Sequence, residues 1–195
     1  MRFADIKRKT SETDIELKLN LDGTGESDIQ TRCGFLDHML TLFAKHGRFN
    51  LELRCSGDVD VDFHHTVEDV GIVLGTAFSQ ALGEKRGIER YGQSLLPMDE
   101  TLILVALDLC GRCTLQYGIE LPTQKVGSFD TELGEEFFLA FCRSSGTTLH
   151  FKQITGSNSH HILEACFKGF ARALRDAVKI NTAAANEIPS SKGIL

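Results

Sequence analysis

The sequence predicts an α+β fold in which one two-layer sandwich occurs twice through an internal duplication. Three observations predict it: the pattern His-His-x-x-Glu occurs twice, each copy opens a segment with helical spacing of apolar residues, and each copy follows a segment of alternating polarity. Both halves then read strand, strand, helix, strand, helix. The first half covers residues 1–88, the second covers 89–185, and a polar tail follows at 186–195.

The first half supplies its elements in that order. Polar and apolar residues alternate over 14–23 ("DIELKLNLDG") and again over 27–33 ("SDIQTRC"), which predicts two strands. Residues 35–47 ("FLDHMLTLFAKHG") are predicted to form a helix that ends at Gly47, a residue suited to a helix C-cap. Residues 50–55 ("NLELRC") alternate as a third strand, and a second helix begins at the first histidine pair.

The second half repeats the series. Two strands are predicted at 100–111 ("ETLILVALDLCG") and 113–121 ("CTLQYGIEL"). A helix at 131–146 ("TELGEEFFLAFCRSSG") again ends at a glycine, and a strand at 147–154 ("TTLHFKQI") leads into the second histidine pair. We therefore expect mainly antiparallel strands with helices on one face of each sheet.

The two helices that follow the histidine pairs have the same apolar phase. Counted from the first histidine of each pair, apolar residues stand at the third, sixth, tenth and fourteenth positions, which trace one face of an α-helix. These positions are Val67, Val70, Leu74 and Phe78 in the first half, and Leu163, Cys166, Phe170 and Leu174 in the second.

The composition is that of an ordinary globular chain. The 195 residues are 42% hydrophobic and 25% charged, with a formal net charge of −6. An acidic balance disfavours a general nucleic-acid binder, and no apolar run reaches the ~20 residues of a membrane helix. Because the N-terminus also lacks the apolar segment of a signal peptide, we expect a cytoplasmic protein that binds neither nucleic acid nor membrane.

The paired histidines predict a metal site. On a helix His64 and Glu68 lie on one face, as do His160 and Glu164, so each pair offers one imidazole nitrogen and one carboxylate to a single ion. The adjacent histidines, His65 and His161, point about 100° away and suit a second ion. Imidazole with carboxylate favours manganese, iron or zinc. The alternative is that both pairs are exposed polar residues at helix starts.

Of the other three histidines, one has a counterpart in the other half and two have none. His38 lies on the earlier helix of the first half, and Glu136 occupies nearly the corresponding place in the second, so this pair supplies a third ligand to each ion. His46 and His150 have no counterpart in the other half, and we interpret both as structural or surface residues.

Taken in order along nearly the whole chain, these segments resemble the imidazoleglycerol-phosphate dehydratase family of histidine biosynthesis. The motifs are "RKTSET" (8–13), "FLDHML" (35–40), "HHTVED" (64–69), "PMDE" (97–100), "GR" (111–112), "PTQKVGSFDTEL" (122–133), "SSGTTLH" (144–150), "SHHILEACFKGFARALR" (159–175) and "PSSKG" (189–193). The resemblance implies a ribosomal protein S5 domain 2-like fold, two manganese ions (Mn²⁺) in each active site, and active sites formed between subunits. It also implies a cubic homo-oligomer of 24 subunits.

The resemblance assigns the metal ligands residue by residue. One ion would take His38, His65, His160 and Glu164, and the other would take His64, Glu68, Glu136 and His161. Glu136 departs from family members that have histidine at this position. A carboxylate oxygen still binds Mn²⁺, so we expect the departure to alter affinity more than to remove the site.

The implied reaction removes water from D-erythro-imidazole-glycerol phosphate to give imidazole-acetol phosphate. The C–H bond that breaks lies next to an alcohol, so an enolate cannot form; two ions on the two ring nitrogens would instead favour a di-manganese-bound imidazolate that expels the neighbouring hydroxyl. An acid–base residue must move protons, and the resemblance gives that role to Glu12. The expected catalytic carboxylates are Glu12, Glu68 and Glu164.

The substrate's phosphate needs cationic and hydroxyl donors. The resemblance and the position of Lys168 one turn after Glu164 predict them, and Glu12 is expected to contact the substrate as well. The phosphate set is Arg90, Arg112, Lys168, Ser190, Ser191 and Lys192. The alternatives are solvated surface charges and, for the tail, a segment without fixed structure.

Two other functions also use paired metal ions. A hydrolase of phosphate esters or peptides would activate a metal-bound water, but its ligands would be richer in aspartate. A metal-storage protein of the ferritin type would place Glu-x-x-His on long bundle helices, whereas this chain has the reverse order and intervening strands. The sequence therefore favours the hydro-lyase over both.

Overall fold

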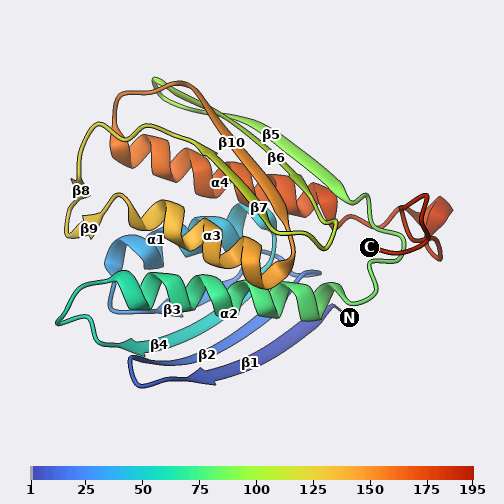
Figure 1. Cartoon of the computed structure of the whole chain (residues 1–195), viewed down its shortest axis with the longest axis horizontal. Coiled ribbons are helices and arrows are strands. Elements are labelled where there is room, and N and C mark those ends of the chain that lie inside the picture. The colour runs from blue at the N-terminus through green and yellow to red at the C-terminus, as the bar shows by residue number, and fades with distance from the viewer. Residues whose placement is uncertain (1) are drawn as a thin grey trace.

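The computed structural model describes residues 2–195 as two α/β sandwiches whose helices face each other (Figure 1). In the first half, α2 packs on β1 and β2, and in the second, α4 packs on β5 and β6. Between the halves, α2 packs on α3 and α1 packs on α4. The helices therefore form the inside of the molecule, and the two sheets form opposite outer layers.

The halves contain matching elements. The first half comprises β1 (Phe3–Lys9), β2 (Thr13–Asn20), β3 (Ser27–Gln30), α1 (Gly34–Gly47), β4 (Asn50–Gly57) and α2 (His64–Leu82). The second comprises β5 (Tyr91–Met98), β6 (Thr101–Asp108), β7 (Thr114–Gly118), α3 (Leu133–Ser145), β10 (Thr148–Thr155) and α4 (Ser159–Ala177). The short strands β8 (Lys125–Val126) and β9 (Phe129–Asp130) precede α3, and a 3₁₀ turn (Thr182–Ala184) follows α4.

Sheet order confirms the duplication. The strands run β1-β2-β4-β3 in one sheet and β5-β6-β10-β7 in the other, so each strand has a counterpart in the same place. The central pairs are antiparallel, whereas β3 pairs with β4, and β7 with β10, in parallel. The predicted α+β class with a duplicated two-layer sandwich is therefore confirmed, and the expectation of antiparallel pairing holds except at these two edges.

The predicted element order omitted one strand in each half. Strands β1 and β5 both lie at sheet edges, so each half has three strands before its first helix instead of two. β1 ("FADIKRK") is rich in charge, and β5 ("YGQSLLPM") contains a glycine and a proline. These residue types weaken a strand prediction, and an edge position is where a sheet tolerates them.

Aromatic packing joins the halves at the centre. Phe170 of α4 is fully buried, and its ring centroid lies 5.7 Å from that of Phe43 on α1 and 5.0 Å from that of Phe141 on α3. The ring thus touches helices of both halves. Packing of this kind fixes α4 relative to α1, which matters because both helices contribute to the site described below.

We expect Phe170→Ala to reduce the free energy of unfolding by about 3–5 kcal/mol, since it leaves a cavity where an aromatic ring joined three helices. Denaturant unfolding followed by circular dichroism measures the change. The matched control is Phe3→Ala on β1, whose side chain is 45% exposed. A loss for Phe170→Ala no larger than that of the control would contradict the central role of this ring.

Within residues 2–195, none of the helices combines the length and the apolar character that crossing a membrane requires.

Candidate functional site

Three predicted ligands from both halves converge at one point. The ligand atoms of His38, His160 and Glu164 all lie within 4.8 Å of one another. The distance from His160 Nε2 to Glu164 Oε2 is 3.1 Å, and from His38 Nε2 to the same oxygen it is 3.5 Å. His38 comes from α1, whereas the other two stand one turn apart on α4, so the packing of α1 on α4 assembles the group.

The start of α4 holds these histidines in place. Asn158 is the N-cap of the helix, and its side-chain oxygen accepts hydrogen bonds from the backbone N–H groups of His160 and His161. An N-cap of this kind satisfies backbone donors that the first turn leaves free. The helix therefore begins at a fixed residue, and both histidines project from its first turn.

The carboxylate of this group is buried. Glu164 is 7% exposed, one oxygen faces the histidines, and the other accepts a hydrogen bond from Lys168 Nζ. Burial alone would raise the pKa of Glu164, but the Lys168 ammonium and the His160 ring outweigh it and hold the pKa below its usual value. Two imidazoles and a buried anionic oxygen form a donor set that suits manganese, iron or zinc.

The first histidine pair lies beside two other carboxylates. His65 Nδ1 is 2.9 Å from Asp58 Oδ2, and His65 Nε2 is 3.9 Å from Glu12 Oε1. The hydrogen bond with Asp58 raises the pKa of His65 above its usual value. The backbone N–H of His64, the first residue of α2, donates to Asp62 Oδ1 at 2.7 Å. The structure thus brings Glu12, the predicted acid–base residue, next to a predicted metal ligand.

The second histidine of α4 has a similar partner. His161 Nδ1 lies 2.8 Å from Glu100 Oε2, and the other oxygen of Glu100 accepts from the backbone N–H groups of Ser157 and Asn158. The hydrogen bond with His161 is the largest cause that lowers the pKa of Glu100, to about 2. Glu100 therefore holds both the loop before α4 and the ring of His161 by hydrogen bonds.

The remaining predicted ligands do not join a group within one chain. Among residues 2–195, His38, His160 and Glu164 are the one set of three or more such side chains with converging ligand atoms. His65 of the first predicted ligand set contacts Asp58 instead. The second predicted set does not meet in this way: His64, Glu68, Glu136 and His161.

Five of the predicted phosphate ligands line one pocket of about 440 Å³: Arg90, Arg112, Ser190, Ser191 and Lys192. Arg90 lies in it as part of an ion pair, with Nε 2.7 Å and Nη2 3.0 Å from the two oxygens of Asp108. Its Nη1 also donates to the backbone oxygen of Pro189, which fastens the tail to the pocket. Lys168 lies elsewhere, because its ammonium binds Glu164.

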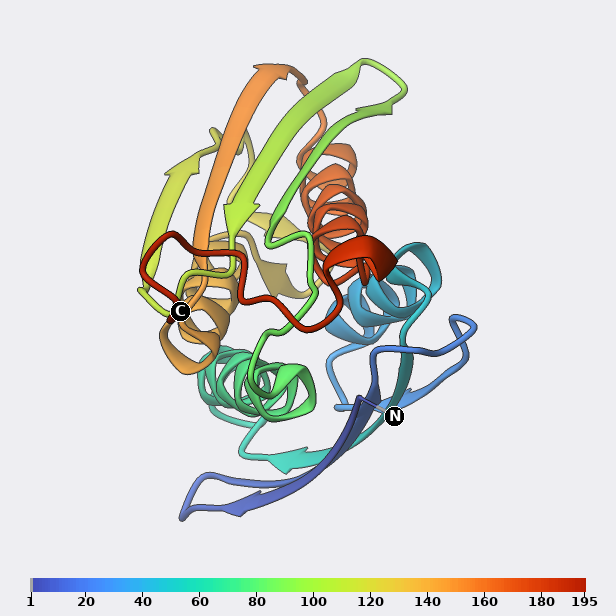
Figure 2. The same cartoon turned by 90° about the vertical axis from the view of Figure 1, so that its right-hand side faces the viewer.

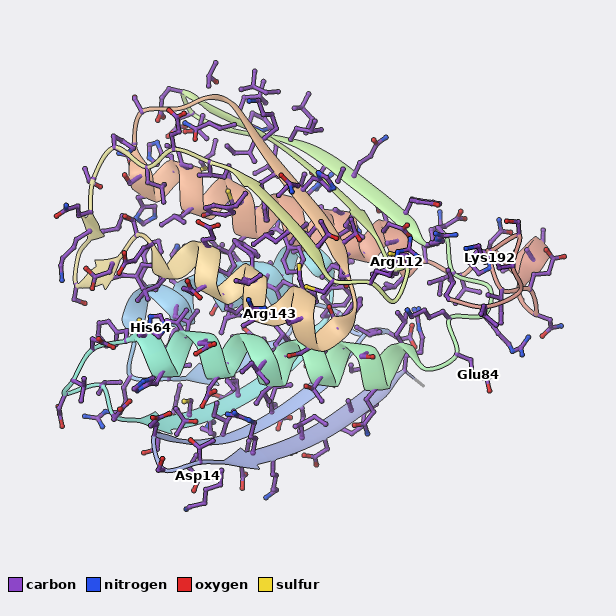
Figure 3. All side chains as sticks on the ribbon, in the orientation of Figure 1. Asp14, His64, Glu84, Arg112, Arg143 and Lys192 are labelled. Carbon is purple, nitrogen blue, oxygen red and sulfur yellow. The ribbon has the colours of Figure 1, made fainter. Side chains whose placement is uncertain are left out.

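The histidines and this pocket lie at opposite ends of the molecule. Figure 3 shows His64 at one end, and Arg112 and Lys192 at the other. Figure 2, which looks onto the second end, shows the C-terminal tail passing in front of the second sheet and α3. Within a single chain, the histidines predicted to bind metal and the residues predicted to bind phosphate therefore lie far apart along the longest axis.

Two carboxylates of this site were not predicted. Asp58 and Glu100 contact the second histidine of each pair, yet neither was given a role from the sequence. Glu100 belongs to "PMDE", a motif that supports the resemblance, but nothing in that motif predicts a contact with His161. Asp58 stands in a turn-like segment of small and acidic residues, which predicts no particular contact.

Comparison with known proteins gives a consistent result. A model of the imidazoleglycerol-phosphate dehydratase family matches residues 31–174. The imidazoleglycerol-phosphate dehydratases of Xanthobacter autotrophicus and Azorhizobium caulinodans are 60% and 58% identical over all 195 residues, and the matches cover 99% of each relative.

Solved structures agree with these relatives. The crystal structure of imidazoleglycerol-phosphate dehydratase from Staphylococcus aureus has a TM-score of 0.84 at 40% identity, covering 92% of this chain and 99% of that one. That of the Pyrococcus furiosus protein has a TM-score of 0.82 at 34% identity, covering 97% of this chain and 100% of that one.

Proposed function

This chain belongs to the imidazoleglycerol-phosphate dehydratase family and is a hydro-lyase of histidine biosynthesis, and we propose that it works with two manganese ions in each active site. One ion is held by His38, His160 and Glu164, with His65 as a fourth ligand. The other is held by His64, Glu68, Glu136 and His161. Its substrate is imidazole glycerol phosphate and its product is imidazole-acetol phosphate.

The observation that carries this proposal is the convergence of His38, His160 and Glu164. A carboxylate that is 7% exposed and lies among imidazoles is costly unless cations balance it, and a divalent ion would add to the balance that Lys168 provides. When bound, the two ions supply Lewis acidity at the two nitrogens of the substrate's ring. Glu136 is half-buried near the start of α3 and offers an oxygen ligand where the family resemblance implies a histidine nitrogen.

Proton transfer falls to Glu12 in this proposal. Its carboxylate is 48% exposed and lies 3.9 Å from His65 Nε2, so it stands at the rim of the predicted metal site. A general acid or base must lie within hydrogen-bond reach of the proton that it moves, and an exposed carboxylate beside a ligand can meet a bound substrate there. Glu68 and Glu164 act as ligands and contribute to catalysis only through the ions.

The distance between the predicted metal ligands and the predicted phosphate pocket supports a homo-oligomer. The substrate's ring and phosphate are joined by a three-carbon chain, which cannot bridge opposite ends of one molecule. We therefore propose that the pocket of one copy meets the histidines of another, in an assembly of 24 subunits. His65, the fourth ligand of the first ion, would then come from a neighbouring copy, and the second ligand set would also be completed by residues of two copies.

The outer faces of the two sheets also support association. On the first sheet the cross-strand pair Lys7 and Glu16 forms an ion pair at 2.6 Å. The corresponding pair on the second sheet is Leu95 and Leu104, which are 57% and 38% exposed, beside Tyr91 at 61%. The outer face of the second sheet is therefore apolar at positions where the first sheet is charged. Exposed apolar surface of this kind is typical of a protein interface.

The tail and its arginines would hold the substrate's phosphate. We expect Arg112→Ala to raise KM by roughly 10- to 100-fold, because a charge-assisted hydrogen bond of about 1.5–3 kcal/mol is lost. Steady-state kinetics with imidazole glycerol phosphate measures it, together with competition by inorganic phosphate. Manganese binding should stay as in the unaltered protein, since the metal ligands lie elsewhere. An unchanged KM would remove Arg112 from the phosphate site.

The proposed function is tested by supplying imidazole glycerol phosphate to the manganese-loaded protein and following ketone formation. Glycerol 3-phosphate, which has the phosphate but no imidazole ring, is the control substrate and should give no product. Formation of ketone only from the ring-bearing substrate supports the proposal. Absence of ketone from it would contradict the proposal. We place the reaction in the cytoplasm.

A further inference from the structure

We propose that a carboxylate fixes the second histidine of each pair through its Nδ1 atom, with Asp58 positioning His65 and Glu100 positioning His161. This inference rests on the proposed function, in which both histidines are metal ligands. Neither carboxylate touches a metal or the substrate in this proposal. Each acts through the histidine that it holds.

The contact between Asp58 and His65 is short and specific. Asp58 Oδ2 lies 2.9 Å from His65 Nδ1, and Asp58 follows β4 directly, in the loop before α2. The backbone N–H of Asp58 donates to the backbone oxygen of Glu12 at 3.1 Å, which holds the loop against the β1–β2 turn. The two segments thus meet around the imidazole ring, with a carboxylate on each side.

The arrangement costs stability. The second oxygen of Asp58 is buried and has no hydrogen-bond partner among the described residues. A buried acceptor without a partner destabilises a fold by about 1–3 kcal/mol. A side chain that served only packing would not need this buried oxygen, so the carboxylate points to a role in holding His65.

The chemical consequence concerns the tautomer of the ring. An acceptor at Nδ1 keeps the ring proton on that atom, so the lone pair of a neutral imidazole stands at Nε2. Nε2 of His65 faces the side of Glu12, at 3.9 Å from its carboxylate. A carboxylate on the distal nitrogen of a metal-binding histidine also raises the basicity of the ligating nitrogen.

The second half reaches the same result by another route. Glu100 Oε2 lies 2.8 Å from His161 Nδ1, but Glu100 comes from the β5–β6 turn and not from the loop before α4. Gly156 lies against Thr101 as Gly57 lies against Thr13, so the position that corresponds to Asp58 is Ser157, which has no carboxylate. Two halves that share an ancestor thus orient the same nitrogen with residues from different elements.

The duplication also gives Glu100 a counterpart, Glu12. Each precedes the buried threonine that starts the second strand of its half, Thr13 or Thr101. Glu100 is fixed by His161 and by two backbone N–H groups. Glu12 stays half exposed. One of the two equivalent glutamates is therefore a positioning residue, and the other is left free to move protons.

The test is an equilibrium manganese titration of the demetallated, full-length protein, with free Mn²⁺ measured by electron paramagnetic resonance. We expect Asp58→Ala to weaken manganese binding by about 10- to 100-fold, the usual effect of removing an outer partner of a metal-binding histidine. Asp58→Asn should lose less, because its amide oxygen can still accept from Nδ1. Glu100→Gln should weaken binding in the same direction.

Two variants are matched controls. They are Asp60→Asn, in the same loop as Asp58, and Glu120→Gln, just after β7; both side chains are exposed. Both variants should bind manganese as the unaltered protein does. The metal-free Asp58 variants should unfold at or above the temperature of the metal-free unaltered protein, because the buried oxygen without a partner is removed. A merely structural role for Asp58 would instead lower that temperature.

The outcomes separate this inference from the proposed function. Unaltered protein that binds no manganese would overturn both. Tight binding by the unaltered protein and equally tight binding by both Asp58 variants would overturn the role of Asp58 alone. Equally tight binding by Glu100→Gln would overturn the role of Glu100. If Asp58→Ala does not fold, Asp58→Asn carries the comparison.

Discussion

The His160→Ala variant is expected to lose manganese binding at the convergent group and to turn over imidazole glycerol phosphate more than about a hundredfold more slowly. Removal of an outer partner alone costs about 10- to 100-fold, and His160 is proposed as a direct ligand. Its Nε2 lies 3.1 Å from Glu164, so the variant also leaves a buried carboxylate with fewer cationic or hydrogen-bonding neighbours. Metal analysis and steady-state kinetics on the same preparation measure both effects.

The control for this variant is His150→Ala. His150 is an exposed residue of β10, on the outer face of the second sheet, and it has no counterpart in the first half. This variant should keep both metal and turnover. Equal losses in the two variants would indicate damage to the fold, and retained metal and turnover in His160→Ala would remove His160 from the ligand set.

The Glu12→Gln variant is expected to keep its manganese and its KM while turnover falls by roughly 10²- to 10⁴-fold, the usual contribution of a general acid or base. Glutamine has the size of glutamate but cannot exchange a proton at neutral pH. Since Glu12 is half exposed and contacts His65 only at 3.9 Å, the substitution should leave the structure in place.

Glu16→Gln is the comparison for Glu12→Gln, because Glu16 is an exposed residue of the next strand whose partner is Lys7. Turnover of the Glu16 variant should stay near that of the unaltered protein. If Glu12→Gln turns over equally well, another residue must transfer the proton. If it loses manganese instead, Glu12 acts on the metal site and not on the substrate.

Much of this architecture follows from the sequence because its signals are local. The i,i+4 spacing of His160 and Glu164 predicts their contact on α4, and the matched apolar phase of α2 and α4 predicts the duplication. The edge strands β1 and β5 were missed because charge, glycine and proline obscure their alternation.

The rest of the site depends on packing between distant segments. His38 reaches His160 and Glu164 only because α1 packs on α4, an arrangement that no local pattern encodes. Glu100 and His161 likewise lie in different elements. The role of Asp58 can be inferred only from its contact with His65 in the folded chain. The predicted second ligand set and the phosphate pocket depend on packing between chains, since the proposal completes both with a neighbouring copy of the chain.

The most direct measurement for the two-ion site is stepwise addition of Mn²⁺ to demetallated protein, with ketone formation followed after each addition. The proposal predicts no turnover without metal and a rise that levels off at two ions for each chain. Full turnover by the metal-free protein, or a plateau that bears no relation to bound manganese, would contradict it.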